Sequence, residues 1–271
     1  MLVAVSVLGI VGHILMDLAT SYGTRLFSPF DWHWYAVDWM PIVDIYLLAI
    51  LIAGLTLARA GTAKAARLAM VALTLTAADY GLRAVAHQQV LAVSRRVLGA
   101  SLPAPCGRAP MPSTLLDRWP TTPFELPPPG EAQCLVELAA TPTFLSPFSW
   151  TVITRTSNAY ALNDVDLLRG TWGAPEAPVP SDRLSRVTRR YPDQWRPQTL
   201  QAATLRDARI YLGFARFPIT RTFVEPDGHA TVRWSDARFA ANPLASRDVR
   251  RPDMLSLSVR VAPDGTVSRI P

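Results

Sequence analysis

Three apolar runs in the first 98 residues constrain the fold of this chain more than any other feature. Residues 1–20 carry only His13 and Asp17 as ionisable side chains, and two further runs cover about 41–58 and 68–93. A stretch of about 20 apolar residues can cross the hydrocarbon core of a bilayer, so we predict a membrane domain over residues 1–98 with about three transmembrane helices. A secretory signal peptide is disfavoured, because the first run has no basic segment before it and no small-residue cleavage pattern after it.

Four ionisable groups lie in or next to the first two runs. His13 and Asp17 are four residues apart, so they share one face of a helix, while Asp38 and Asp44 lie near the start of the second run. A carboxylate within a bilayer costs roughly 2.5–3.5 kcal/mol on insertion scales, so such a residue is expected to face inward and to have a function. If the two runs form a helical hairpin, all four groups meet at one membrane face.

These side chains predict two alternatives. His13, Asp17 and Asp44 offer one imidazole and two carboxylates, a set that suits zinc, manganese or ferrous iron. A metal there would lower the pKa of bound water and polarise a phosphoryl or acyl oxygen, with Asp38 as general base or as a hydrogen-bond partner of His13. In the alternative, the same groups form a buried polar network that only fixes the hairpin.

The third run carries Asp79, Arg83 and His87 at intervals of four residues, so all three lie on one helix face. An ion pair between Asp79 and Arg83 that orients the helices is the favoured interpretation, since buried charges usually pair. A direct role for His87 as metal ligand or general base is the other. His33 lies among tryptophan and tyrosine residues, which favours an exposed imidazole at the membrane–water interface.

Residues 148–271 predict a small α+β domain outside the membrane. Asp227-Gly228 and Asp264-Gly265 lie between alternating runs, which is typical of β-hairpins. This part holds 18 basic and 12 acidic side chains, and the difference of six equals the whole chain's net charge of +6. It therefore has either a plain solvated basic surface or a site for an anionic lipid or a phosphorylated substrate. No nucleic-acid-binding motif is present in the sequence, so we predict no nucleic-acid partner.

Residues 99–147 read as a proline-rich linker, because 102–147 contain 11 of the 24 prolines. The two cysteines, Cys106 and Cys134, flank most of it and would pair in an oxidising compartment. The loop with Arg59, Lys64 and Arg67 is basic and therefore predicted to be cytoplasmic. That orientation predicts a multi-pass membrane protein whose C-terminal domain lies outside, in the periplasm if the cell has one.

An ordered series of motifs runs through the chain. Its members are Gly12-His13-x-x-x-Asp17, Ser21-Tyr22-Gly23-Thr24, Pro29-Phe30, Asp38-Trp39, Asp44, then Tyr80, Arg83 and His87, and in the second half Ser146-Pro147-x-x-Trp150, Phe214-x-Arg216-Phe217-Pro218, Asp236-x-Arg238-Phe239 and Asp264-Gly265. This series resembles the bacterial YdjM-like family of inner-membrane proteins, described as LexA-regulated or LexA-binding and proposed to be metal-dependent hydrolases.

The resemblance implies a membrane-bound hydrolase with a divalent metal ion, zinc or manganese, acting on a phosphoester or lipid-linked substrate. The family also carries an earlier His-Arg…Thr-His motif, which is missing here, and Asp44 is followed by Ile45 where the family often has proline. We therefore expect the missing imidazoles to be encoded upstream or by a neighbouring gene. The alternative is a non-catalytic membrane protein whose C-terminal domain is a binding module.

Overall fold

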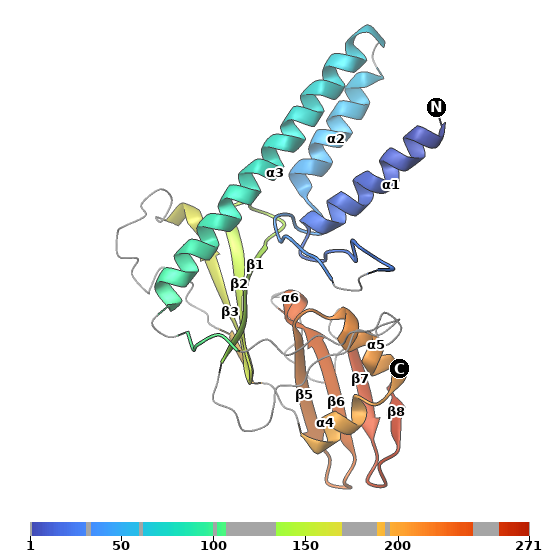
Figure 1. The fold of residues 1–271 in the computed structure, drawn as a ribbon, viewed down its shortest axis with the longest axis vertical. Coiled ribbons are helices and arrows are strands. Elements are labelled where there is room, and N and C mark those ends of the chain that lie inside the picture. The colour runs from blue at the N-terminus through green and yellow to red at the C-terminus, as the bar shows by residue number, and fades with distance from the viewer. Residues whose placement is uncertain are drawn as a thin grey trace.

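The computed structural model describes residues 2–30, 34–59, 62–99, 102–106, 134–169, 189–192, 196–240 and 255–270. Its first part consists of three apolar helices, α1 (Leu2–Ala19), α2 (Ile45–Ala58) and α3 (Thr62–Leu98). α2 and α3 form a hairpin that projects away from two β-sheets, and the N-terminus and the α2–α3 turn both lie at the end far from the sheets (Figure 1). His33 and its predicted interfacial position fall outside the described residues.

Within the described residues, two helices are long and apolar enough to cross a membrane, at Leu2–Ala19 and Ala65–Arg96. α2 has 14 residues and so is about 21 Å long at 1.5 Å per residue, short of a hydrocarbon core of about 30 Å. α2 begins at Ile45, later than the predicted position 41, because Asp44 is its N-cap. One carboxylate oxygen of Asp44 accepts from the backbone N–H groups of Tyr46 and Leu47, each at 2.8 Å. The apolar helices are confirmed, but three complete spans are not.

The first sheet is an antiparallel meander in the order β1-β2-β3-β4. Its strands are β1 (Leu135–Pro142), β2 (Ser149–Thr156), β3 (Ala159–Asp166) and β4 (Arg189–Pro192), and the short 3-10 helix η2 (Leu167–Arg169) follows β3. β1 falls within the stretch assigned to the linker. Its proline ends the strand, and Ala139 and Ala140 pair with Ile153 and Val152 on β2. Residues 107–133 of the predicted linker lie outside the described part of the chain.

The first sheet is buried on both faces, because successive strand residues point to opposite sides. Ala140 and Val152 face α3 and pack with Ala86 and Val90 of that helix. Ala139 and Ile153 face the opposite way, toward Phe217, which lies just before β5, and Ile219 of the second sheet. The two parts of α3 therefore differ in their surroundings. Its first part lies in the projecting hairpin, and its last part covers the first sheet.

The second sheet is also an antiparallel meander, in the order β5-β6-β7-β8. Its strands are β5 (Pro218–Val224), β6 (Ala230–Asp236), β7 (Ser256–Val261) and β8 (Val267–Arg269), with helices α4 (Pro197–Ala202), α5 (Arg206–Phe214) and α6 (Ala237–Ala240) around it. The two predicted Asp-Gly hairpins are present, and Gly228 and Gly265 have φ values of 83° and 89°, which suit glycine. The prediction of apolar helices followed by a soluble domain is confirmed, and the described strands of that domain form these two sheets.

Candidate functional site

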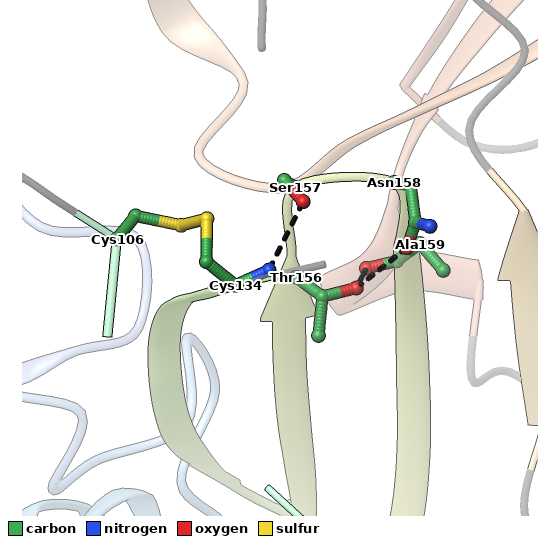
Figure 2. The surroundings of a disulfide bond; sticks show 6 residues. All are labelled: Cys106, Cys134, Thr156, Ser157, Asn158 and Ala159. Atoms are coloured by element: carbon green, nitrogen blue, oxygen red, sulfur yellow. Dashed lines mark hydrogen bonds between the residues drawn. A yellow bond between two sulfur atoms is a disulfide. The ribbon is translucent and has the colours of Figure 1, made fainter. Parts of the chain in front are cut away.

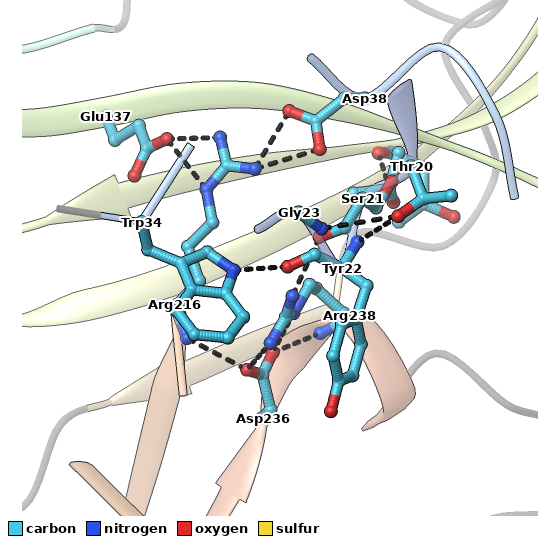
Figure 3. A network of polar contacts seen from close by, with 12 residues as sticks. Thr20, Ser21, Tyr22, Gly23, Trp34, Asp38, Glu137, Arg216, Asp236 and Arg238 are labelled. Carbon is cyan, nitrogen blue, oxygen red and sulfur yellow. Dashed lines mark hydrogen bonds and ion pairs between the residues drawn. The ribbon is translucent and has the colours of Figure 1, made fainter. Parts of the chain in front are cut away.

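The motif residues from the two halves of the chain meet where the loop after α1 contacts both sheets. Figure 3 shows this junction: side chains from residues 20–38 lie against side chains from β1, the start of β5 and the end of β6. We call it the charged junction, and define it by Ser21, Tyr22, Asp38, Glu137, Arg216, Asp236 and Arg238.

Arg216, just before β5, lies at the centre of the charged junction. Its Nη1 donates to both carboxylate oxygens of Asp38, at 2.8 and 2.9 Å, and its Nη2 donates to Glu137 of β1 at 2.6 Å. Asp38 is buried, with a φ of 63°, a left-handed conformation that aspartate and asparagine adopt more readily than most residues. One guanidinium thus joins the membrane-proximal loop to the first sheet and the start of the second.

Burial sets the acid–base behaviour of this pair. It raises the pKa of Asp38 above its usual range, and the neighbouring Arg216 guanidinium only partly offsets that effect. Burial alone would lower the pKa of Arg216, but the carboxylates of Asp38 and Glu137 outweigh it, so the pKa of Arg216 is raised. Arg216 therefore stays a cation, and Asp38 is the member of the pair that can lose its charge.

A second arginine fixes the same loop to the end of β6. Arg238 donates to both carboxylate oxygens of Asp236, at 3.0 and 2.7 Å, and its Nη1 donates to the backbone carbonyl of Ser21 at 2.7 Å. Its guanidinium also lies over the ring of Tyr22, 5.7 Å from the centroid. The ring of Tyr22 in turn packs edge-on against Phe214, at 5.2 Å between centroids. Polar and aromatic contacts thus hold the loop together.

Asp44 and Arg83 form a separate ion pair between the N-terminus of α2 and α3. The Arg83 side chain is fully buried, and its Nη2 contacts the Asp44 carboxylate oxygen that does not cap α2. Asp79 lies one turn earlier on α3, with its carboxylate 3.6 Å from Nε of Arg83. The predicted Asp79–Arg83 pair is therefore present, and Asp44, a predicted metal ligand, is a second and closer partner of Arg83.

His87 completes the predicted face of α3 and points toward the first sheet. It is 93% buried, since its exposed fraction is 7%, and its ring lies 5.5 Å from the ring of Trp150 on β2. Its Nδ1 is buried without a hydrogen-bond partner. His87 is thus part of the packing between α3 and the sheet.

The remaining predicted ligands lie on the outside of α1. Nε2 of His13 is 3.4 Å from a carboxylate oxygen of Asp17, and the two side chains are 78% and 44% exposed. In the described parts of the chain, no group of three or more histidine, cysteine, aspartate or glutamate residues could hold a metal ion. The metal site of His13, Asp17 and Asp44 stays a prediction.

Cys106 and Cys134 are joined by a disulfide, with their Cα atoms 5.0 Å apart (Figure 2). The backbone around the bond is also paired: the N–H of Cys106 donates to the carbonyl of Leu135, and the N–H of Cys134 donates to the hydroxyl of Ser157. The bond joins the segment after α3 to the residue just before β1, beside the β2–β3 turn.

The arginine partners at the charged junction were not predicted. Arg216 and Arg238 lie in the motifs noted above, yet nothing in their spacing indicates which carboxylates they meet, because the contact between Arg216 and Asp38 spans 178 positions. Glu137 gave no signal at all, since it lies in the proline-rich stretch. For Arg216 the sequence did offer a hint, because this charged residue stands directly before Phe217 and Pro218, where β5 begins.

The described residues thus form apolar N-terminal helices, which fit a membrane location, and two antiparallel sheets that the charged junction joins to them. Residues 1–90 match the model of the family described as YdjM inner membrane protein. The N-terminal third of the chain is therefore similar to this family, in agreement with the resemblance noted in its sequence motifs. No curated protein and no solved structure matches the chain.

Proposed function

We propose that this protein is a non-catalytic membrane protein whose inward polar groups fix a two-sheet binding module against the membrane face. The observation that supports this proposal best is the occupation of Asp38. Both of its carboxylate oxygens accept from Arg216, and its side chain is 6% exposed. A general base needs an oxygen within reach of the proton that it removes, which is hard to achieve for a buried carboxylate held on both sides by one guanidinium.

Asp44 supports the same proposal. One of its oxygens caps α2 and the other contacts Arg83, so both are already engaged by the protein. A carboxylate in this arrangement would have to give up a helix cap and a buried ion pair before it could bind a metal. The cost of leaving Arg83 buried without this partner opposes such a change.

We further propose a multi-pass arrangement in the inner membrane with the two sheets in the periplasm. Three features support it. The loop with Arg59, Lys64 and Arg67 is basic, as expected on the cytoplasmic side. It lies at the end of the hairpin opposite the sheets (Figure 1), and the disulfide between Cys106 and Cys134 suits an oxidising compartment.

The ligand class that fits such a module is an anionic lipid headgroup. The excess of six positive charges lies wholly in residues 148–271, and the charged junction holds the described strands of this part beside the apolar helices. Basic side chains near a membrane surface attract anionic lipids over roughly a Debye length of 8–10 Å.

Metal-dependent hydrolysis is the second candidate function, and one observation favours it. His13 and Asp17 lie together on an exposed helix face, where an ionisable pair in a membrane helix is usually functional. With zinc or manganese bound there, further ligands would come from another segment or chain, and the substrate would be a phosphoester or a lipid-linked compound. The described residues supply only this pair.

Metal content separates the two candidates. The detergent-purified full chain, produced with zinc and manganese supplied, would be analysed as wild type, as His13→Ala and as His229→Ala. His229 is a matched control because it also contacts an aspartate, Asp227, at 2.9 Å. We expect no stoichiometric metal in any of the three. About one metal ion per chain, lost in His13→Ala and kept in His229→Ala, would overturn our proposal in favour of the hydrolase.

Binding of anionic lipid is measured with the same detergent-purified full chain. Exchanged against equal amounts of phosphatidylglycerol and phosphatidylcholine, the chain should retain the anionic lipid preferentially, and high salt should remove the preference. Equal retention of both lipids at low salt would contradict an anionic ligand.

A further inference from the structure

The loop between β1 and β2 exposes two large apolar side chains that no core explains. Phe144 and Leu145 are 55% and 63% exposed. The loop is nevertheless well ordered by its own hydrogen bonds: the hydroxyl of Thr143 donates to the carbonyl of Ser146, and the hydroxyl of Ser146 accepts from the N–H of Phe148. The two side chains are therefore held outward by a structured turn.

This loop lies beside the first turn of α2. The hydroxyl of Tyr46 donates to the backbone carbonyl of Leu145 at 3.0 Å, across 99 positions of sequence. Ile42 and Val43, just before α2, are themselves 55% and 59% exposed. Figure 1 shows the β1–β2 connection at the end of the first sheet nearest to α2. The exposed apolar surface of the loop is thus continuous with the exposed apolar surface of the membrane helices.

The chemistry of this patch matches the boundary between lipid headgroups and acyl chains. Tyrosine is enriched there, because its ring is apolar and its hydroxyl needs a polar partner, which Leu145 supplies here. A contiguous apolar patch on a folded surface usually marks a membrane or protein contact. Continuity with α2, whose first turn contains Tyr46, favours the membrane.

We propose that Phe144 and Leu145 form a second membrane anchor, which inserts into the bilayer interface beside α2. The two-sheet domain would then contact the membrane directly, in addition to its covalent attachment through α3. This inference rests on the membrane location of the helices and goes beyond the proposed binding function, and its failure would leave the metal and lipid-retention results unchanged.

The test uses the full chain reconstituted in vesicles of phosphatidylcholine and phosphatidylglycerol. Because Cys106 and Cys134 are disulfide-bonded, a single added cysteine can be labelled with an environment-sensitive NBD fluorophore without reduction. Leu145→Cys carries the probe, and Phe144→Cys provides a second position if the first variant fails to fold. Leu200→Cys is the matched control, since Leu200 is 44% exposed on α4, on the side of the second sheet away from the membrane helices.

Lipids that carry a nitroxide near the top of the acyl chain then report contact with the bilayer. The expected result is blue-shifted NBD emission at position 145 or 144 that loses intensity with the nitroxide lipid, and unshifted, unquenched emission at position 200. Water-like emission at all positions would overturn the proposal. Shielded emission at 145 and 144 without quenching would also overturn it, because the patch would then be covered by protein, such as a second copy of this chain.

Discussion

Arg216 and Asp38 are 178 positions apart in sequence and are joined by two hydrogen bonds of 2.8 and 2.9 Å. Asp38 lies in the loop between the apolar helices α1 and α2, and Arg216 lies just before β5 of the second sheet. The extramembrane domain is therefore attached to the membrane part by a buried ion pair as well as by the chain itself. A variant that removes the Arg216 guanidinium should loosen the domain without changing its internal cores.

Replacing Arg216 with alanine should be the most damaging single change at the charged junction. It leaves Asp38 buried and Glu137 beside it without their cation, and breaking a buried pair in this way costs about 3 kcal/mol or more. Thermal unfolding in detergent should show a clear fall in midpoint, and trypsin should cleave the variant faster. Arg260→Ala is the control, because it removes the same charge from an exposed pair with Glu225 and should change little. Equal behaviour of the two variants would contradict the structural role of Arg216.

Asp38→Asn should lower the stability of the folded protein only slightly, and it should remove the part of the pH dependence of stability that comes from Asp38. Asparagine also adopts the left-handed backbone at this position and can still accept from Arg216. The pKa of Asp38 is raised in the folded state by burial, with Arg216 and His87 opposing this effect and Glu137 adding to it. Its contribution to stability is thus complete below the unfolded pKa of about 3.9 and is lost as pH rises through the folded value.

The measurement is the difference in unfolding midpoint between wild type and Asp38→Asn, followed from acidic to weakly acidic pH. We expect the unfolding midpoint of the wild type to fall relative to that of Asp38→Asn as the pH rises over that window. If the wild-type midpoint instead rose relative to that of the variant, the attraction of Arg216 for the Asp38 carboxylate would outweigh the effect of burial on its pKa.

Asp44 allows its two roles to be separated. Asp44→Asn keeps an oxygen to cap α2 but removes the charge that faces the fully buried Arg83, at a cost of about 3 kcal/mol. Asp44→Ala also removes the cap, which should cost about 1 kcal/mol more. The measurement is unfolding in detergent, with Asp79→Asn as the comparison, since Asp79 lies farther from Arg83, at 3.6 Å. If Asp79→Asn were the more damaging variant, the assignment of Asp44 as main partner would be wrong.

The sequence predicted the parts of this fold that depend on local pattern. Apolar runs located the helices, Asp-Gly dipeptides located two hairpins, and the spacing of Asp79 and Arg83 predicted their ion pair. It failed where long-range packing decides. Arg83 chooses between two carboxylates by how α2 packs on α3, and β1 is a strand in a proline-rich stretch because β2 provides its hydrogen bonds. Neither outcome is encoded in a short segment.

The disulfide should stabilise the first sheet. Cys106 and Cys134 are 28 positions apart, and chain-entropy models give about 3–4 kcal/mol for a loop of that length. The double variant Cys106→Ser with Cys134→Ser should unfold at a lower temperature than the oxidised wild type. Reductant should lower the wild-type midpoint to that of the variant and leave the variant itself unaffected, which serves as the internal control. The bond would be excluded if reductant left the wild-type midpoint unchanged and the unfolded, unreduced wild type had two reactive thiols.

Membrane topology is the last prediction, and it links the disulfide to the basic loop. The N-terminus and the turn between α2 and α3 lie on one side of the molecule and the sheets on the other (Figure 1). If the helices cross a membrane, the compartment of the turn therefore determines the compartment of the sheets. Because Arg59, Lys64 and Arg67 favour the cytoplasm, a fusion after Pro271 should be active as alkaline phosphatase and dark as green fluorescent protein. A fusion after Arg59 should give the opposite pattern and is the matched control. If instead the C-terminal fusion fluoresces, the sheets face the cytoplasm, where reducing conditions would leave Cys106 and Cys134 as thiols.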